Sequence, residues 1–277
     1  MTADDLLSRL VLESRQDLQR RRHLVDSDRF EQAVAAYTPK DFAGALRRPT
    51  LAIIAEMKQR TPSMGVLSED YRPADLAHAY AEGGAAAISV LTHMAGFGGR
   101  VEHLRAVRAT TDLPMLRKDF VTDPYEVAEA RACGADAVLL IVAALLPEQL
   151  RNLIAVSRSR GVAALVEVHD ERETAVALDA GAAMIGVNHR DLRTFEVDLG
   201  LTERLRKLIP PGVVVVAESG IHSAEDARRM REAGADAILV GELLMRSTDP
   251  AAQIRALSTP GARRAHPTPG ARRAHPN

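Results

Sequence analysis

Five charged side chains lie at or just beyond the ends of short apolar segments, where they could act together in proton transfer. Glu56 and Lys58 end the segment "LAIIAEMK", Lys118 ends "PMLRK", and Glu167 and Glu218 lie near the ends of "VAALVEV" and "VVVVAES". Lysine can protonate a carbonyl group, and glutamate can accept and return a proton. The combination of residue types predicts acid–base chemistry if one fold brings these segments to a common site.

A further apolar segment ends in Asn188, and Arg190 follows it. Arginine binds anions through two parallel hydrogen bonds, so this end favours an anionic substrate. A network of structural ion pairs is the alternative for any one of these charges, because structural pairs also perturb pKa values. Several charges collected at one site would be costly to desolvate, and this favours a ligand-binding pocket.

Two glycine-containing turns suggest where a phosphate group would bind. Ser219 and Gly220 precede a helical segment in "AESGIHSAED", and Gly241 and Glu242 follow an apolar segment in "LVGELLMR". Backbone N–H groups in such turns, beside a helix N-terminus, are a common anion site in barrel enzymes. The alternative is that the glycines serve only to make tight turns.

A recurring phrase organises the chain into the elements that must position these residues. Gly-Ala followed by an apolar run occurs in "GGAAAISVL", "CGADAVLLI", "AGAAMIGVN" and "AGADAILVG", which start at residues 83, 133, 180 and 233. Each phrase predicts the end of a helix followed by a buried strand. Four more strand-like runs lie between the phrases, at 51–57, 114–118, 162–168 and 213–219. Eight strands alternating with helices predict an α/β protein with a (β/α)8 TIM barrel, and the glycine-rich fingerprint of an open doubly wound sheet is absent after the first strand.

Alternation along these strands predicts which way the charges point. Glu56 and Lys58 share the parity of Ile54, and Lys118, Glu167 and Glu218 are each two residues beyond an apolar strand residue. Successive side chains of a barrel strand alternate between the lumen and the outer layer, and catalytic groups lie at the carboxyl ends. We therefore expect these charges to meet in the mouth of the barrel.

The sequence divides into three parts. Residues 1–46 predict a helical extension packed on the barrel, residues 47–258 the catalytic barrel, and residues 259–277 a disordered tail. The tail repeats "TPGARRAHP" twice in tandem and has almost nothing apolar to bury beyond alanine.

Composition excludes several classes of protein. The chain has five Phe, four Tyr and no Trp, and residues 1–258 hold 32 basic against 37 acidic side chains, which argues against a nucleic-acid partner. Its single cysteine, Cys133, excludes disulfide frameworks and cysteine metal clusters. No apolar run reaches the ~18 residues of a membrane span and no secretory signal pattern begins the chain, so we expect a cytoplasmic protein without a membrane partner.

The chain resembles the indole-3-glycerol-phosphate synthase family over roughly residues 42–250. The resemblance rests on "IIAEMKQRTPSMG", "ISVLT", "LRKDFVTDPYEVAEARACGADAVLLI", "LVEVHDE", "IGVNHRDLRTFEVDL", "AESGI" and "VGELLMR". It implies a carboxy-lyase of tryptophan biosynthesis, or a paralogue in a specialised indole pathway. The family converts 1-(o-carboxyphenylamino)-1-deoxyribulose 5-phosphate, a small phosphosugar, to indole-3-glycerol phosphate by ring closure, decarboxylation and dehydration, without metal or cofactor. We further expect a monomer or weak homodimer.

The resemblance assigns a role to each candidate residue. Lys118 would be the general acid for ring closure, Glu167 would transfer protons during dehydration, and Glu56 would stabilise cationic intermediates. The residues implied in substrate binding are Lys58, Asn188, Arg190, Glu218, Phe97 and Phe120. The residues implied in phosphate binding are Ser219, Gly220, Gly241 and Glu242.

Five positions depart from the family pattern. Thr61 replaces a serine and keeps the hydroxyl group. Gly96 replaces a tyrosine, Arg100 a serine and Leu243 a small residue, near the second loop and the phosphate end. His189 between Asn188 and Arg190 also differs, and we expect it to be an exposed loop histidine.

Two other functions compete with this interpretation. One is a sugar-phosphate isomerase of the phosphoribosylanthranilate isomerase type, and the other is a non-catalytic phosphosugar-binding barrel. The isomerase family relies on a cysteine and an aspartate, whereas Cys133 is predicted at a helix end opposite the active rim. A barrel that only binds would not need the full set of charges.

Overall fold

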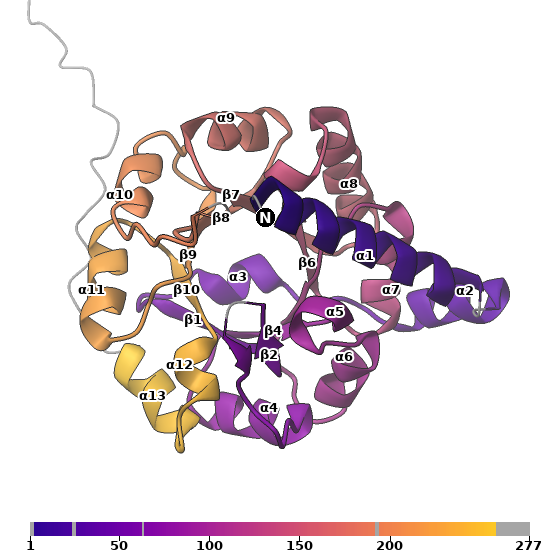
Figure 1. Cartoon of the computed structure of the whole chain (residues 1–277), viewed down its shortest axis with the longest axis horizontal. Coiled ribbons are helices and arrows are strands. Elements are labelled where there is room, and N and C mark those ends of the chain that lie inside the picture. The colour runs from indigo at the N-terminus through magenta and orange to yellow at the C-terminus, as the bar shows by residue number, and fades with distance from the viewer. Residues whose placement is uncertain (1–2, 24–25, 63, 192–193, 259–277) are drawn as a thin grey trace, which may run out of the picture.

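The computed structural model describes residues 3–23, 26–62, 64–191 and 194–258 (Figure 1). Eight parallel strands form a closed barrel, in which each strand pairs with its neighbours in chain order and the first pairs with the last. The strands are β1 (Ala52–Met57), β4 (Ala87–Leu91), β5 (Met115–Lys118), β6 (Ala137–Ile141), β7 (Ala163–Val168), β8 (Met184–Asn188), β9 (Val214–Glu218) and β10 (Ala237–Val240). The predicted (β/α)8 barrel and all eight predicted strands are confirmed.

Helices follow the strands and cover the outside of the barrel (Figure 1). They are α4 (Pro73–Glu82), α5 (Met94–Phe97), α6 (Val101–Arg108), α7 (Pro124–Ala132), α8 (Pro147–Ser159), α9 (Glu171–Asp179), α10 (Leu201–Arg206), α11 (Ala224–Glu232), α12 (Glu242–Met245) and α13 (Pro250–Leu257), with the 3-10 turn η1 (Val142–Ala144). A short hairpin, β2 (Arg60–Thr61) with β3 (Gly65–Val66), follows β1 and was not predicted.

The recurring Gly-Ala phrase ends helices as predicted. Gly84, Gly134, Gly181 and Gly234 all have φ between 83° and 92°. This left-handed conformation is open to glycine without steric cost, and it turns the chain from a helix into the next strand. The start of α7 is also determined by nearby residues, because Asp123 and Glu126 form a capping box at its N-terminus.

Alternate strand residues supply two separate apolar layers. The outer layer, between strands and helices, includes Ile53, Ala55 and Met57. The layer inside the barrel includes the lumen residues Ile54, Leu116, Leu165 and Val216. Each of these lumen residues is followed two positions later by one of the predicted site charges. The predicted parity is therefore confirmed.

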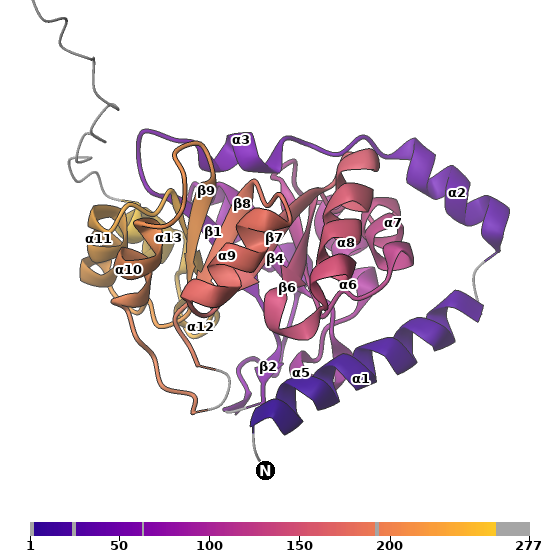
Figure 2. The same cartoon turned by 90° about the horizontal axis from the view of Figure 1, so that it is seen from above.

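The N-terminal segment contacts both ends of the barrel. It contains α1 (Ala3–His23), α2 (Ser27–Ala36) and α3 (Phe42–Leu46). Figure 2 shows α1 and α3 on opposite sides of the barrel. Helix α1 contacts α5 and η1, which follow the carboxyl ends of β4 and β6, whereas Phe42 and Leu46 of α3 pack into the lumen layer from the amino end. The extension thus closes the amino end of the barrel and lies over the mouth.

Among the described residues, no helix is long and apolar enough to cross a membrane. The predicted tail, residues 259–277, lies outside the described residues.

Candidate active site

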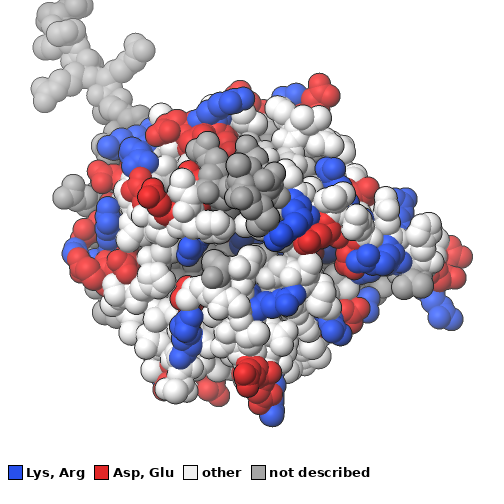
Figure 3. Space-filling view, in the orientation of Figure 1, with Lys and Arg blue, Asp and Glu red and all other residues white. Residues whose placement is uncertain are grey.

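A pocket of about 200 Å³ opens at the carboxyl ends of the strands. Figure 3 shows this face, with a hollow near its centre and basic side chains around it. The pocket lining includes every residue that the sequence proposed for the site: Glu56, Lys58, Phe97, Lys118, Phe120, Glu167, Asn188, Arg190, Glu218, Ser219, Gly220, Gly241 and Glu242. The structure brings these residues together, and their individual roles remain predictions.

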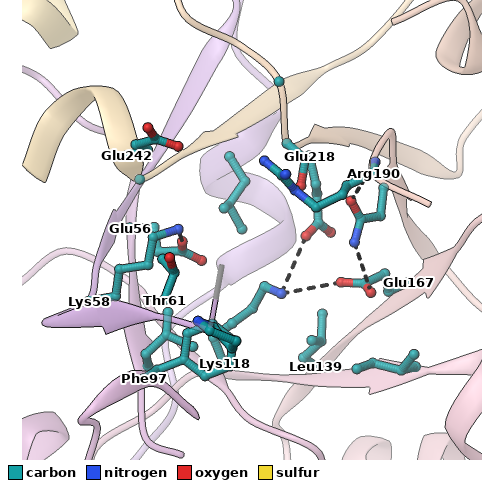
Figure 4. A pocket seen from close by; sticks show the side chains of 18 of the residues that line it. Glu56, Lys58, Thr61, Phe97, Lys118, Leu139, Glu167, Arg190, Glu218 and Glu242 are labelled. Carbon is teal, nitrogen blue, oxygen red and sulfur yellow. Dashed lines mark hydrogen bonds and ion pairs between the residues drawn. The ribbon is translucent and has the colours of Figure 1, made fainter. Parts of the chain in front are cut away.

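Lys118 lies between two buried carboxylates at the floor of the pocket (Figure 4). Its Nζ is 3.2 Å from Oε2 of Glu167 and 3.7 Å from Oε2 of Glu218. The two carboxylate side chains are only 3% and 2% exposed. The three groups come from β5, β7 and β9, so the closure of the barrel is what brings them into contact.

Burial and charge act in opposite directions on Lys118. Burial alone would lower the pKa of the ammonium group, but the carboxylates of Glu167 and Glu218 outweigh it and raise the pKa above its ordinary value. Burial likewise opposes ionisation of Glu167, and the charge of Lys118 lowers the pKa of this carboxyl well below its ordinary value. Lys118 and Glu167 therefore form an ionised pair at neutral pH.

Glu218 is the carboxyl that the cluster leaves incompletely paired. Burial raises its pKa to about 8, because the attraction of Lys118 does not compensate for burial and for the charge of Glu167. Within the described part of the chain, its buried Oε1 makes no hydrogen bond. This oxygen lies over Gly186 of β8, where an added Cβ would collide with it. Glycine at 186 is thus needed for the carboxyl to occupy its place.

Glu56 and Lys58 form a second pair on the other side of the pocket. Nζ of Lys58 is 2.5 Å from Oε1 of Glu56, and the two side chains are 15% and 6% exposed. An added Cβ at Gly241 would lie 2.5 Å from Oε1 of Glu56 and 2.9 Å from Nζ of Lys58. The absence of a side chain at Gly241 therefore leaves room for this pair.

Asn188 connects Glu167 to the loop that bears Arg190. Its Nδ2 donates to Oε1 of Glu167 at 3.2 Å, and its Oδ1 accepts from the backbone N–H of Arg190 at 3.1 Å.

Apolar side chains form another wall of the pocket, where the ring centroids of Phe97 and Phe120 lie 6.5 Å apart. The pocket thus offers charged groups on one side and aromatic rings on another.

The turn after β9 has a backbone suited to an anion. Ser219 and Gly220 have φ of 68° and 74°, so two successive residues are left-handed. The conformation is strained for serine, and such strain is concentrated at functional sites. An added Cβ at Gly220 would collide with Val197.

The second predicted turn, after β10, begins with Gly241 and Glu242. The carboxylate of Glu242 pairs with Nε of Arg246 at 3.3 Å. A carboxylate would repel a phosphate, so the group of Glu242 suited to bind one is its backbone N–H.

The prediction that His189 is exposed is wrong. The residue is 2% exposed and its ring lies behind the Ser219 turn. Nδ1 is 2.9 Å from the carbonyl oxygen of Ser219, and Nε2 is 2.6 Å from Oγ1 of Thr202. Since a carbonyl oxygen only accepts, Nδ1 is the donor, and burial lowers the pKa of the ring. The prediction was based on the position of His189 next to a loop, and nothing in the sequence indicated that α10 packs over its ring.

The other departures from the family pattern lie at different distances from the pocket. Thr61 lines it, and its hydroxyl accepts from the N–H of Met64 at 3.1 Å. Gly96 is buried, and an added Cβ would lie 3.0 Å from Leu10 of α1, so its small size admits that helix. Among the described residues, Arg100 and Leu243 do not line the pocket: Arg100 is exposed before α6, and Leu243 packs against the outer layer.

Two parts of the site were not predicted from the sequence. Leu6, Leu7 and Leu10 of α1 line the pocket, although the sequence predicted only that they pack on the barrel. His169 lies behind Glu167, with Nε2 3.4 Å from Oε1 of that carboxylate. Its position two residues after Glu167, with the same parity, was a signal that could have identified it.

Within the described ranges, no group of three or more His, Cys, Asp or Glu side chains could hold a metal ion. Fold and pocket together define a (β/α)8 barrel with a pocket of charged and apolar side chains at the carboxyl ends of its strands.

The family model for indole-3-glycerol phosphate synthase matches residues 7–257. The chain is 57% identical over 253 residues to indole-3-glycerol phosphate synthase 2 of Streptomyces coelicolor, an alignment that covers 91% of this chain and 98% of the relative. It is 50% identical over 265 residues to indole-3-glycerol phosphate synthase of a Roseiflexus species, covering 92% and 98%. The chain therefore belongs to the indole-3-glycerol phosphate synthase family.

Solved structures of low sequence identity share the fold alone. Thiamine phosphate pyrophosphorylase from Pyrococcus furiosus aligns with a TM-score of 0.60 at 21% identity, covering 76% of this chain and 95% of that one. The 3-hexulose-6-phosphate synthase from Salmonella typhimurium aligns with a TM-score of 0.59 at 15% identity, covering 75% and 97%.

Proposed function

We propose that this chain is a carboxy-lyase that converts 1-(o-carboxyphenylamino)-1-deoxyribulose 5-phosphate to indole-3-glycerol phosphate in tryptophan biosynthesis. Membership of the family supports the activity. The observation that supports it in the structure is the buried ion pair of Lys118 and Glu167 at the floor of a pocket that also has an apolar wall.

Lys118 acts as the general acid in this proposal. Ring closure joins an aromatic carbon to a carbonyl carbon, and protonation of the carbonyl oxygen makes that carbon a better electrophile. Lys118 is protonated at neutral pH and points into the pocket (Figure 4). The neighbouring carboxylates stabilise the positive charge that develops on the aromatic amine as the ring closes. When the carboxyl group then leaves as carbon dioxide, the electron pair of the broken C–C bond returns to the ring and removes this charge.

Glu167 then transfers a proton during dehydration. It is ionised before substrate binds, so it can accept a proton from the cyclised intermediate. Glu56 stabilises the cationic intermediates, and its pair with Lys58 orients both side chains. Asn188 and Arg190 hold the reacting part of the substrate, and Phe97 and Phe120 supply the apolar surface for an aromatic ring.

The phosphate group binds at the other end of the pocket. Ser219 and Gly220 present a left-handed turn after β9, and Gly241 and Glu242 begin the chain after β10. The backbone N–H groups of these turns are the donors for a dianion. Without side chains, Gly220 and Gly241 leave these N–H groups unshielded, so a ligand can approach the backbone closely.

The position of Cys133 argues against the isomerase alternative, which needs a cysteine in the active site. Cys133 is buried at the C-terminal end of α7, before β6 begins, so it lies at the amino end of the barrel. It cannot reach a substrate in the mouth. A barrel that only binds a phosphosugar would need the turns after β9 and β10 but not the charged floor.

The direct test is a turnover assay with purified protein and the carboxyphenylamino-deoxyribulose phosphate, followed by indole fluorescence. We expect product and carbon dioxide in equal amounts. Binding without fluorescence would instead support the non-catalytic barrel, and conversion of phosphoribosylanthranilate would support the isomerase.

A further inference from the structure

A buried histidine lies on the side of Glu167 away from Lys118. Nε2 of His169 is 3.4 Å from Oε1 of Glu167, whereas Lys118 approaches Oε2 of the same carboxylate at 3.2 Å. The histidine side chain is only 15% exposed. Within the described residues, its Nε2 makes no aligned hydrogen bond, so the contact with Glu167 is an ion pair. Glu167 is therefore held between two cations.

Glu173 fixes the other nitrogen of the ring. Nδ1 of His169 lies 3.0 Å from Oε2 of Glu173, which also accepts from the His169 backbone N–H at 2.8 Å. Burial disfavours the charged ring, but the two glutamates outweigh it and raise the pKa of His169 to about 10. His169 is therefore a permanent cation between two carboxylates at neutral pH.

The second cation becomes important when Lys118 has given away its proton. Neutral Lys118 no longer stabilises the Glu167 carboxylate, which is 3% exposed and would be protonated by burial alone. A protonated Glu167 could not accept the proton released in the later dehydration step. Glu56, which also faces the cluster from β1, does not help, because a neighbouring negative charge favours protonation, and Glu218 on β9, with a raised pKa, supplies no positive charge.

We propose that His169, anchored by Glu173, is a positioning residue that keeps Glu167 ionised and oriented after Lys118 has transferred its proton. The proposal rests on the proposed function, because it assigns Lys118 and Glu167 their steps in that reaction. His169 itself does not line the pocket among the described residues, and it acts through Glu167. Two other acids are close in sequence: Asp170 caps α9 by accepting from the N–H of Glu173, and the exposed Glu171 pairs with Nε of Arg204 at 3.7 Å.

Two variants separate the charge of the histidine from its shape. His169→Gln keeps a hydrogen-bond donor near Glu167 but removes the charge. Glu173→Gln keeps the acceptor for the His169 backbone N–H but removes the charge that keeps the ring protonated. His78→Gln, at an exposed position of α4, is the matched control for replacing a histidine.

We expect His169→Gln to lower kcat by about tenfold or more at neutral pH, with KM within about twofold of the wild type. In Glu173→Gln the histidine pKa falls toward its ordinary range, so the ring loses its charge as pH rises. The loss of kcat in this variant should be about tenfold greater at pH 9 than at pH 6. A purely structural role predicts lower melting temperatures and pH profiles parallel to that of the wild type, and that outcome would overturn the proposal.

The charge of His169 can also be measured without turnover. In ¹⁵N-labelled protein, the wild-type His169 ring should remain protonated from pH 6 to pH 9, and the ring in Glu173→Gln should titrate within that range. A wild-type ring that titrates near its ordinary pKa refutes the proposal even if the enzyme is active. If the wild type shows this permanent charge but does not turn over the substrate, the proposed function has failed and the anchored histidine stands.

Discussion

Strand β5 bears two buried cations on consecutive residues, and they have opposite surroundings. Arg117 points to the outer layer and is fully buried, whereas Lys118 points into the lumen and is 16% exposed. Both contact carboxylates, so the presence of an ion pair does not distinguish a structural residue from a catalytic one. The two cations differ in how many of their N–H donors have hydrogen-bond partners.

Arg117 has partners for every nitrogen of its guanidinium group. Nε donates to Thr92, Nη1 to Glu129 at 2.8 Å and Nη2 to Asp119 at 3.0 Å. Glu129 in turn binds Arg21, so this cluster also attaches α1 to the barrel. Oε1 of Glu126 lies 3.8 Å from Nη2 and makes no hydrogen bond among the described residues, but the donors of Arg117 itself are all used. A fully buried cation with no free donor is typical of a structural ion cluster.

The lumen cluster is open on the side of the pocket. Lys118 contacts two carboxylates, and one oxygen of Glu218 has no hydrogen-bond partner among the described residues. Its charges are therefore free to respond to a substrate. The cation that lines a cavity, Lys118, is therefore the better candidate for catalysis, and Arg117, which does not line the pocket among the described residues, is the better candidate for a structural role.

The largest effect should come from breaking the closed cluster. Arg117→Met leaves buried carboxylates without their common cation, and we expect a loss of about 3–5 kcal/mol in the free energy of unfolding. Chemical denaturation measures it. Arg151→Met, at an exposed position of α8, should change stability by less than about 0.5 kcal/mol. Equal stabilities of the two variants would remove the distinction between the clusters.

Lys118→Met tests the open cluster. The substitution keeps the apolar stem and removes the acidic proton, so single-turnover ring closure should slow by ~10²-fold or more. Binding should suffer less, because Lys58, Arg190 and the phosphate turns remain. Near-normal ring closure by a folded variant would contradict the assignment of Lys118 as the general acid.

Gly241→Glu adds bulk and negative charge between the open cluster and the phosphate end. The new side chain meets Glu56 and Lys58, and its charge repels a dianion. We expect KM to rise by about tenfold or more, with a smaller change in kcat. Inorganic phosphate should raise the melting temperature of the wild type more than that of the variant. Equal protection of both would place the phosphate elsewhere.

Glu218→Gln should have the smallest effect, on the pH dependence of stability. The pKa of Glu218 is raised from 4.5 to about 8, so between these values the folded protein binds more protons than the unfolded chain. Stability from this group is therefore complete below pH 4.5 and is lost as pH rises through about 8. The variant should lose less stability than the wild type between pH 5.5 and pH 8.5.

Glu148→Gln, at an exposed position, controls for loss of a surface charge. A Glu218→Gln variant with the same pH slope as the wild type would show that Glu218 is ionised in the fold.

Local patterns were sufficient to predict the barrel. Gly84, Gly134, Gly181 and Gly234 each end a helix for reasons contained in a few adjacent residues. The short hairpin β2–β3 was not predicted, because two-residue strands leave no periodic pattern. The crossing of α1 over the mouth was also beyond the sequence, since apolar residues such as Leu10 show that a face is buried but not against what.

The candidate site was predictable to the extent that it depends on strand parity. Ile54 and Glu56, or Leu116 and Lys118, are two residues apart on one strand, and this spacing alone directs each charge to the lumen. His189 shows the limit of such reasoning. It follows a strand and precedes a loop, and only the position of Thr202 on α10 makes it a buried residue.

The eight strands and the lumen face of each are thus encoded locally, because they follow from periods of two and 3.6 residues. The pairing of the charges depends on the tertiary structure. Parity separates Arg117 from Lys118 in the chain, but it does not give their partners: Glu126 and Glu129 of α7 contact the first, while Glu167 and Glu218, about 50 and 100 residues away, reach the second through the closure of the barrel. Distances between groups on different strands depend on how the whole sheet closes, and no local pattern contains that information.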